Sequence, residues 1–175
     1  MATLIFGLQV ATNLLLFSLV SRRYLMPRLR AMPLYDALMP LLLFHMLRTM
    51  GITFVLPQVV GQQLPPGFAV PGALGDLLAV VLALAAIIAL RLRLPFALGV
   101  VWLFNVAGTL DFVYAFAQGL RFDIAQQYAL GPVWFIPTFF VPAFFVTHMI
   151  VFVLLLTKER HRRSLAPFQA VERSA

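Results

Sequence analysis

The sequence predicts an all-α integral membrane protein, a bundle of about five transmembrane helices. Of its 175 residues, 62% are hydrophobic and only 11% are charged, whereas soluble domains are about 45–50% apolar. The apolar residues fall into runs long enough to cross a hydrocarbon layer of about 30 Å, which takes about 20 helical residues. A water-soluble fold could not bury this much apolar surface, so the helices are expected to lie in a membrane.

The first two predicted helices cover residues 2–20 and 34–56. No basic segment precedes the first apolar run and no small-x-small cleavage site follows it, so an uncleaved helix is favoured over a signal peptide. The second run follows Pro33 and stops before Pro57, positions at which proline is tolerated or ends a helix. Residues 58–71 are uncharged and turn-rich, which predicts a loop.

The other three predicted helices cover residues 72–90, 96–118 and 133–157. The third is rich in small residues that permit close helix packing. The fifth contains Pro137 and Pro142, which should bend it. We expect residues 1–157 to form a single transmembrane bundle and residues 158–175 to form a basic cytoplasmic tail.

The positions of the basic residues predict the orientation. The connection between the first and second helices holds four Lys or Arg residues, the connection between the third and fourth holds two, and the tail holds five. The connections on the other side hold Arg121 alone. The positive-inside rule therefore puts the N-terminus outside and the C-terminus in the cytoplasm. The tail is expected to contact anionic lipid rather than nucleic acid. The basic residues are Arg22, Arg23, Arg28 and Arg30, then Arg91 and Arg93, then Lys158, Arg160, Arg162, Arg163 and Arg173.

Polar residues inside the apolar runs give the candidate ligand-binding site. They are His45, Arg48, Asp76, Asn105 and Asp111. An ionised side chain near the bilayer centre costs roughly 2.5–3.5 kcal/mol on insertion scales, so such residues usually face the bundle interior and find partners. A rise of about 1.5 Å per residue places the three charged residues in one layer on the outer side of the midplane. We expect Arg48 to lie between Asp76 and Asp111, with His45 one turn below.

Helical spacing predicts which face is polar. His45, Arg48, Thr49 and Ile52 follow the i, i+3, i+4, i+7 pattern of one α-helical face. Asn105 and Asp111 form a second polar stripe with a glycine between them, where a backbone or ligand can approach closely.

Charge balance gives the site a functional meaning. One arginine and two aspartates leave a net charge of −1, so either one aspartate holds a proton or a histidine is charged. The pocket is expected to bind a small polar or amphipathic ligand, with Arg48 anchoring an anionic group, or to exchange protons, and to open toward the outer face. A polar clasp that only fixes helix register explains the same residues.

Three other classes remain open. His45 and His148 lie at similar depths and could hold a haem as axial ligands. A structural or assembly partner of a membrane complex would use the tail and the small-residue face of the third helix. Enzymatic activity is disfavoured, because the chain has no cysteine, no metalloprotease motif and no Ser/His/Asp set at a shared depth. No metal site is predicted. Transport would require a homo-oligomer, since five helices form a small pore at best.

Three short motifs support a resemblance. They are Leu-Pro-Pro-Gly-Phe-Ala at 64–69 leading to Asp76, Asn-Val-Ala-Gly-Thr-Leu-Asp at 105–111, and Ile-Pro-Thr-Phe-Phe-Val-Pro at 136–142 reaching His148. With them the chain resembles a family of small bacterial multi-pass membrane proteins of uncharacterised activity. The resemblance implies a bacterial inner membrane, in contact with the lipid bilayer, and carries over no catalytic or binding residue.

Overall fold

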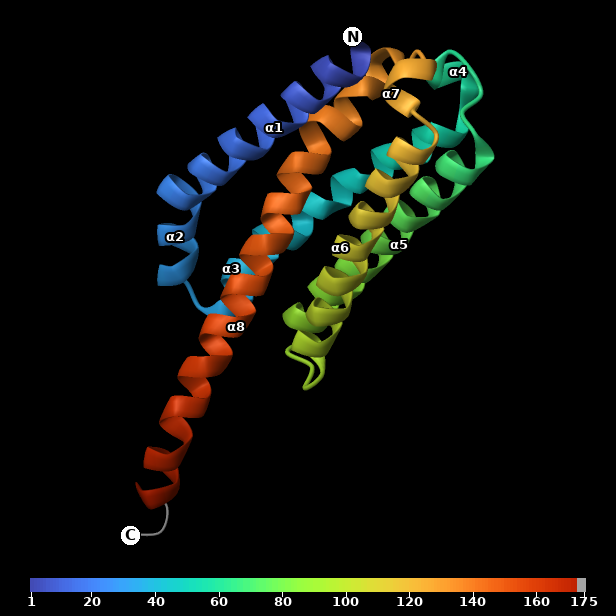
Figure 1. Ribbon diagram of the computed structural model, residues 1–175. Helices are drawn as coiled ribbons and strands as arrows, with labels where there is room; N and C mark the ends of the chain where they lie inside the picture. Colours follow the sequence, from blue (N-terminus) through green and yellow to red (C-terminus); the bar gives the residue numbers. More distant parts are fainter. Residues whose placement is uncertain (173–175) are drawn as a thin grey trace.

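The computed structural model describes the backbone of residues 1–172 and the side chains of residues 1–157 (Figure 1). Across residues 1–172 the chain is helical and contains no strand. Five helical stretches in this part of the chain are long and apolar enough to cross a membrane: Ala2–Ala31, Leu34–Val55, Pro66–Arg91, Ala97–Arg121 and Gly131–Thr157. The predicted class, all-helical with five apolar helices of membrane-spanning length, is confirmed.

The first stretch is longer than expected. Helix α1 (Ala2–Val20) continues through one π-helical segment, η1 (Ser21–Leu25), into α2 (Met26–Ala31). The helix passes the first arginines because Arg is a good helix former, and it ends shortly before Pro33, since a residue preceding proline avoids the α conformation. None of the 19 described residues of α1 is buried.

The second stretch changes helix type in the middle. Helix α3 (Leu34–Phe44) gives way to a 3₁₀-helix, η2 (His45–Val55). A 3₁₀-helix has 3.0 residues per turn, so every third side chain falls on the same face. The buried residues of η2 follow that period: His45, Arg48, Gly51 and Phe54. The expected α-helical face was therefore wrong at Thr49 and Ile52, which are exposed.

The loop predicted for residues 58–71 is largely helical. It contains the short helix α4 (Pro57–Val60) and the start of α5 (Pro66–Arg91). Pro66 suits the first turn of a helix, whose N–H groups are unpaired in any case. Pro71 lies inside α5 and cannot donate to the carbonyl of Gly67. That carbonyl accepts a hydrogen bond from Nε2 of Gln118 instead, at 3.1 Å.

The last two stretches also differ from the prediction at their ends. Helix α6 (Ala97–Arg121) is followed by α7 (Ile124–Gln127), and the fifth stretch is built from η3 (Gly131–Trp134), the π-helical η4 (Ile136–Phe140) and α8 (Val141–Glu172). Helix α8 continues beyond the expected end at residue 157. The side chains of the basic tail, 158–175, lie outside the described residues, so its contact with lipid stays a prediction.

Proline explains how α1 is attached. Pro142 has no N–H with which to pair the carbonyl of Thr138, and Nδ2 of Asn13 donates to this carbonyl at 2.9 Å. A second polar contact joins α1 to η3, since Nε1 of Trp134 donates to Oε1 of Gln9 at 2.6 Å. Side chains of α1 thus satisfy polar groups of the last stretch.

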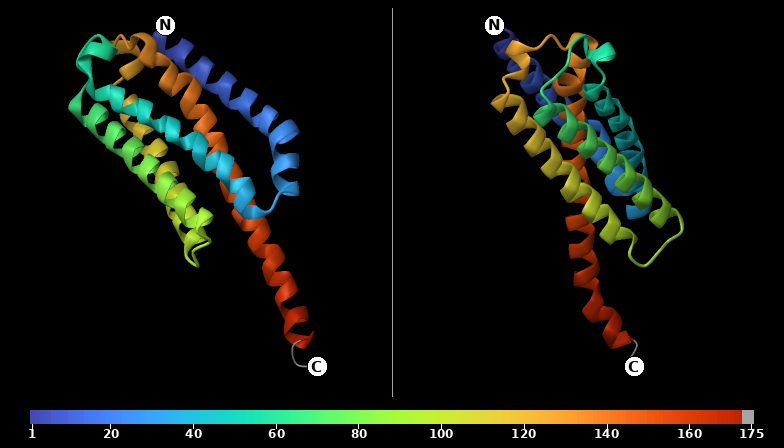
Figure 2. Two further views of the ribbon diagram at one scale, coloured as in Figure 1. Left: turned by 180° about the vertical axis from the view of Figure 1, so that it is seen from behind. Right: turned by 90° about the vertical axis from the view of Figure 1, so that its right-hand side faces the viewer.

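The helices form two groups on either side of α8. Helices α5 and α6 run side by side, and α3 with η2 packs along α5, whereas α1 packs on α8, η4 and α7 (Figures 1 and 2). One apolar core joins α3, α5, α6 and α8. A second lies at the end of the bundle that holds the N-terminus, around α4 and η3. The polar residues of the candidate site fall between these two cores along each helix.

Candidate functional site

Arg48 is the centre of a buried ion cluster. Its side chain is 0% exposed. Its Nε donates to Oδ1 of Asp76 at 2.7 Å, and its Nη2 donates to Oδ2 of Asp111. The structure therefore places Arg48 between the two aspartates, as the sequence predicted, and links η2, α5 and α6 through one guanidinium group. Two carboxylates on a buried arginine are charge-assisted contacts, about twice as strong as neutral hydrogen bonds.

The remaining donors of Arg48 are also paired. Its Nη1 lies 3.5 Å from the carbonyl of Gly108 and 3.4 Å from Nε2 of His148. The guanidinium carbon lies 4.0 Å from the centroid of the Phe112 ring, an attractive cation–π arrangement. The cation is thus surrounded by oxygen, nitrogen and an aromatic face, which replace the water that it loses on burial.

Three glycines let the helices approach the cluster closely. A methyl group added at Gly51 would overlap the carboxylate of Asp76, and one added at Gly75 would overlap that of Asp111. At Gly108 the added carbon would lie 2.6 Å from the His148 ring. Each charged or polar side chain therefore occupies the space that a side chain on the neighbouring helix would otherwise fill.

Asn105 fixes the tautomer of His148. Nδ2 of Asn105 donates to the backbone carbonyl of His148 at 3.1 Å, and Oδ1 of Asn105 lies 2.7 Å from Nδ1 of His148. Because Oδ1 can only accept, Nδ1 of His148 carries the hydrogen. Nε2 is then an acceptor facing Arg48, which matches a neutral imidazole.

His45 is less well paired than His148. Its Nε2 lies 2.9 Å from Oγ1 of Thr147, whose hydroxyl donates to the carbonyl of Phe144 at 2.8 Å. The threonine oxygen consequently accepts from His45. Nδ1 of His45 is buried and has no hydrogen-bond partner among the described residues. Aromatic rings of Phe104, Phe144 and His148 surround it.

The two histidines do not fit a haem. Axial imidazoles must coordinate one iron from opposite faces, and bonds of about 2 Å each separate the two nitrogens by about 4 Å, with the ring centroids further apart. The ring centroids of His45 and His148 are only 4.2 Å apart, and both nitrogens of His148 already have partners. The described residues also contain no group of three or more His, Cys, Asp or Glu residues that could hold a metal ion.

The different pairing of the two histidines predicts different effects of substitution. His148→Phe should destabilise the protein by about 1–3 kcal/mol, because it leaves Oδ1 of the buried Asn105 without a donor. His45→Phe should cost less, since it places a ring among aromatic rings and removes the unpaired nitrogen. Thermal unfolding of the purified variants measures both, and equal losses would show that the hydrogen-bond assignment is wrong.

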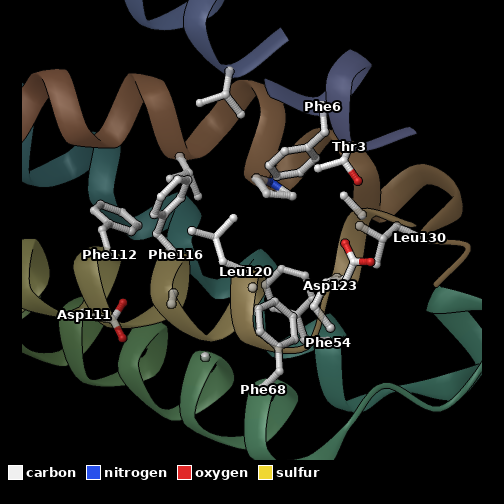
Figure 3. Close-up of a pocket in the computed structure, with 18 of the residues that line it drawn as sticks. Thr3, Phe6, Phe54, Phe68, Asp111, Phe112, Phe116, Leu120, Asp123 and Leu130 are labelled. Carbon is white, nitrogen blue, oxygen red and sulfur yellow. The ribbon is translucent and has the colours of Figure 1, made fainter. Parts of the chain in front are cut away.

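A cavity of about 130 Å³ lies beside the ion cluster (Figure 3). Its floor includes Asp76 and Asp111, whose side chains are 13% and 15% exposed. Asp123 lies at the other end, with phenyl rings between the two ends. The described residues lining the cavity do not include Arg48. The aromatic lining residues come from α1, η2, α5 and α6: Phe6, Phe54, Phe68, Phe112 and Phe116.

The structure brings four of the five expected site residues into one hydrogen-bonded network and leaves His45 outside it. Arg48, Asp76 and Asp111 form one network with His148, and Asn105 holds His148 in place. Arg48 is not positioned to anchor an anionic ligand, because its guanidinium is fully buried and already bound. His45 joins the cluster only through ring contact with His148.

Several residues of the site were not predicted. Thr147 and Phe112 are ordinary residues of apolar helices in sequence, and Asp123 lies between the predicted helices at 96–118 and 133–157. Gly51 and Gly75 carried a usable signal, because each lies within three residues of a cluster side chain. His148 was considered only as a haem ligand, because the helical rise placed it on the inner side of the midplane, away from the charged layer.

The fold and the site define a class: an all-helical protein whose described part holds five apolar helices of membrane-spanning length, with a buried Arg–Asp–Asp cluster beside an aromatic cavity. Residues 5–156 match the model of a family described as a domain of unknown function, DUF8737. The chain belongs to this family, and the match includes every residue of the cluster. Comparisons with curated proteins and with solved structures gave no match.

Proposed function

We propose that the protein is a multi-pass protein of the bacterial inner membrane that binds a small amphipathic molecule in the cavity beside Arg48. The observation that carries the proposal is a cavity with aromatic walls and a charged floor. Ligand sites are typically concave, mostly apolar and equipped with a few placed polar groups. A clasp that only fixed helix register would not need an adjoining empty space.

The proposed orientation has the N-terminus outside and the C-terminus in the cytoplasm. It rests on the distribution of Lys and Arg. The cavity is lined by Thr3 and Phe6, close to the N-terminus, so it would face the outer side. The cysteine-free sequence allows a direct test with Ala2→Cys and Ala175→Cys. A membrane-impermeant maleimide should label only the first in intact cells, and labelling of only the second would reverse the orientation.

The size of the cavity limits the ligand. An engineered cavity of about 150 Å³ in another protein accepts benzene, so 130 Å³ suits a group of that size. Three probes each carry one phenyl group of this size and differ mainly in the charge of the substituent: benzyl alcohol, benzyltrimethylammonium and phenylacetate. We expect at least one of them to bind to the purified protein in lipid nanodiscs.

Filling the cavity tests whether binding occurs there. Ala115 lines the cavity, whereas Ala117 on the same helix is exposed and lies outside it. Ala115→Leu should weaken binding of the probe by at least about tenfold, about 1.4 kcal/mol, because the larger side chain occupies the space. Ala117→Leu adds the same atoms elsewhere and should leave binding unchanged. Titration calorimetry measures both, and equal affinities in the two variants would refute the cavity as the site.

A further inference from the structure

All charged side chains among the described lining residues are acidic. Asp76, Asp111 and Asp123 line the cavity, and Figure 3 shows Asp111 and Asp123 at opposite ends of it. Asp76 is close to Asp111, because both carboxylates contact Arg48. Arg48 lies behind the first two, with its N–H groups directed at them, at Gly108 and at His148. A molecule in the cavity would therefore meet carboxylate oxygens and phenyl rings, but no basic group of the described lining.

The cluster is also short of positive charge. The single positive charge of Arg48 faces the carboxyl groups of Asp76 and Asp111, which leaves a formal net charge of −1 when both are ionised. His148 does not correct the deficit, because its hydrogen-bond pattern is that of a neutral imidazole. A surplus charge is unfavourable in a medium of low dielectric constant. A cation placed in the cavity would remove that surplus.

The aromatic walls favour the same sign of charge. The faces of phenyl rings carry negative electrostatic potential and attract ammonium groups, with quaternary ammonium ions as a well-known case. Five phenylalanines line the cavity. An anion would be repelled by the carboxylates and by the face of a phenyl ring, so the two observations favour the same sign of charge.

We infer, on the basis of the proposed function, that the ligand is an amphipathic organic cation with an ammonium head group. The head group lies against the carboxylates of Asp76 and Asp111, and the apolar part lies along the phenylalanine rings. Asp123, for which the described residues provide no ion-pair partner within 4.0 Å, adds negative potential that draws the cation in. This assigns the ligand a charge opposite to that expected for an Arg48 anchor.

Binding of the three probes to the full-length protein tests the inference. Nanodiscs of zwitterionic lipid avoid the attraction of cations to anionic lipid. We expect benzyltrimethylammonium to bind more tightly than benzyl alcohol or phenylacetate. Asp123→Asn should weaken the cation about fivefold, as expected for one partly screened charge, and leave benzyl alcohol unchanged.

The control variants separate specific binding from a general charge effect. Asp123 has a φ of 45°, which asparagine adopts readily, so the variant is expected to fold. Asp36→Asn removes an equal charge from a groove that α3 forms with Arg91 and Arg93, away from the cavity, and should not change the affinity. Equal weakening by both variants would contradict the inference, because the cation would then respond only to net charge.

The failure of the inference differs from the failure of the proposed function. If phenylacetate or benzyl alcohol binds at least as tightly as the cation and Ala115→Leu blocks it, the cavity binds ligands but the charge assignment is wrong. If no probe binds, or if Ala115→Leu leaves all affinities unchanged, the proposed function and the inference both fail.

Discussion

Arg48→Met should reduce the free energy of unfolding by about 3–5 kcal/mol, the cost of leaving buried charges without their partner. The variant removes the group that joins Asp76 to Asp111 and exposes two carboxylates to an apolar surrounding. Methionine fills part of the space, so the loss comes from charge more than from volume. The midpoint of SDS-induced unfolding, followed by tryptophan fluorescence, measures the effect.

Arg121→Met is the matched control for this result. Arg121 is exposed at the end of α6 and lies over the ring of Phe122 at 5.6 Å. Substitution of an exposed residue usually changes stability by no more than about 0.5 kcal/mol. If the two arginine variants unfold at the same SDS concentration, Arg48 is not a structural centre of the bundle.

Gly108→Ala should destabilise the protein by about 1–3 kcal/mol or more, in the range of overpacked cores. The added carbon would lie 2.6 Å from Cε1 and Nε2 of His148 and 3.1 Å from Nη1 of Arg48. These atoms cannot withdraw without breaking the contacts to Asn105 or to the aspartates. The same unfolding assay applies.

Gly99→Ala on the same helix should have the opposite sign. No heavy atom lies within 4 Å of a carbon added at Gly99, and alanine restricts the unfolded chain, which stabilises by about 0.4–1 kcal/mol. The difference between the two variants separates the effect of steric overlap at Gly108 from the general effect of replacing glycine by alanine in a helix. A gain in stability from Gly108→Ala would mean that His148 and Arg48 do not lie against α6.

The fold was largely predictable because its main determinant is composition. Long apolar runs identify the five helices without knowledge of their packing. The ends of the helices were less predictable, because proline and arginine can lie either inside a helix or just outside it. Pro66 begins a helix that was assigned to a loop, since the first turn tolerates proline, and Arg22 and Arg23 lie inside a continuous helix.

The site was predictable in its charges and not in its geometry. Arg48, Asp76 and Asp111 could be grouped because ionised side chains in apolar helices need partners. The face of η2 could not be predicted, because an α-helical period was assumed where the chain is 3₁₀. Because of the 3₁₀ period, Gly51 and Phe54 face the neighbouring helices, where Thr49 and Ile52 had been expected. The cavity depends on packing among five helical segments, which no local pattern specifies.

A double-mutant cycle between Arg48 and Asp111 tests the ion cluster most directly. The free energies of unfolding of the wild type, Arg48→Met, Asp111→Leu and the double variant are measured in bicelles. A buried pair in direct contact should show a coupling free energy above about 1 kcal/mol, within the range of about 0.5–3 kcal/mol for interacting residues. Additive effects, agreeing within about 0.3–0.5 kcal/mol, would show that the two side chains do not meet inside the bundle.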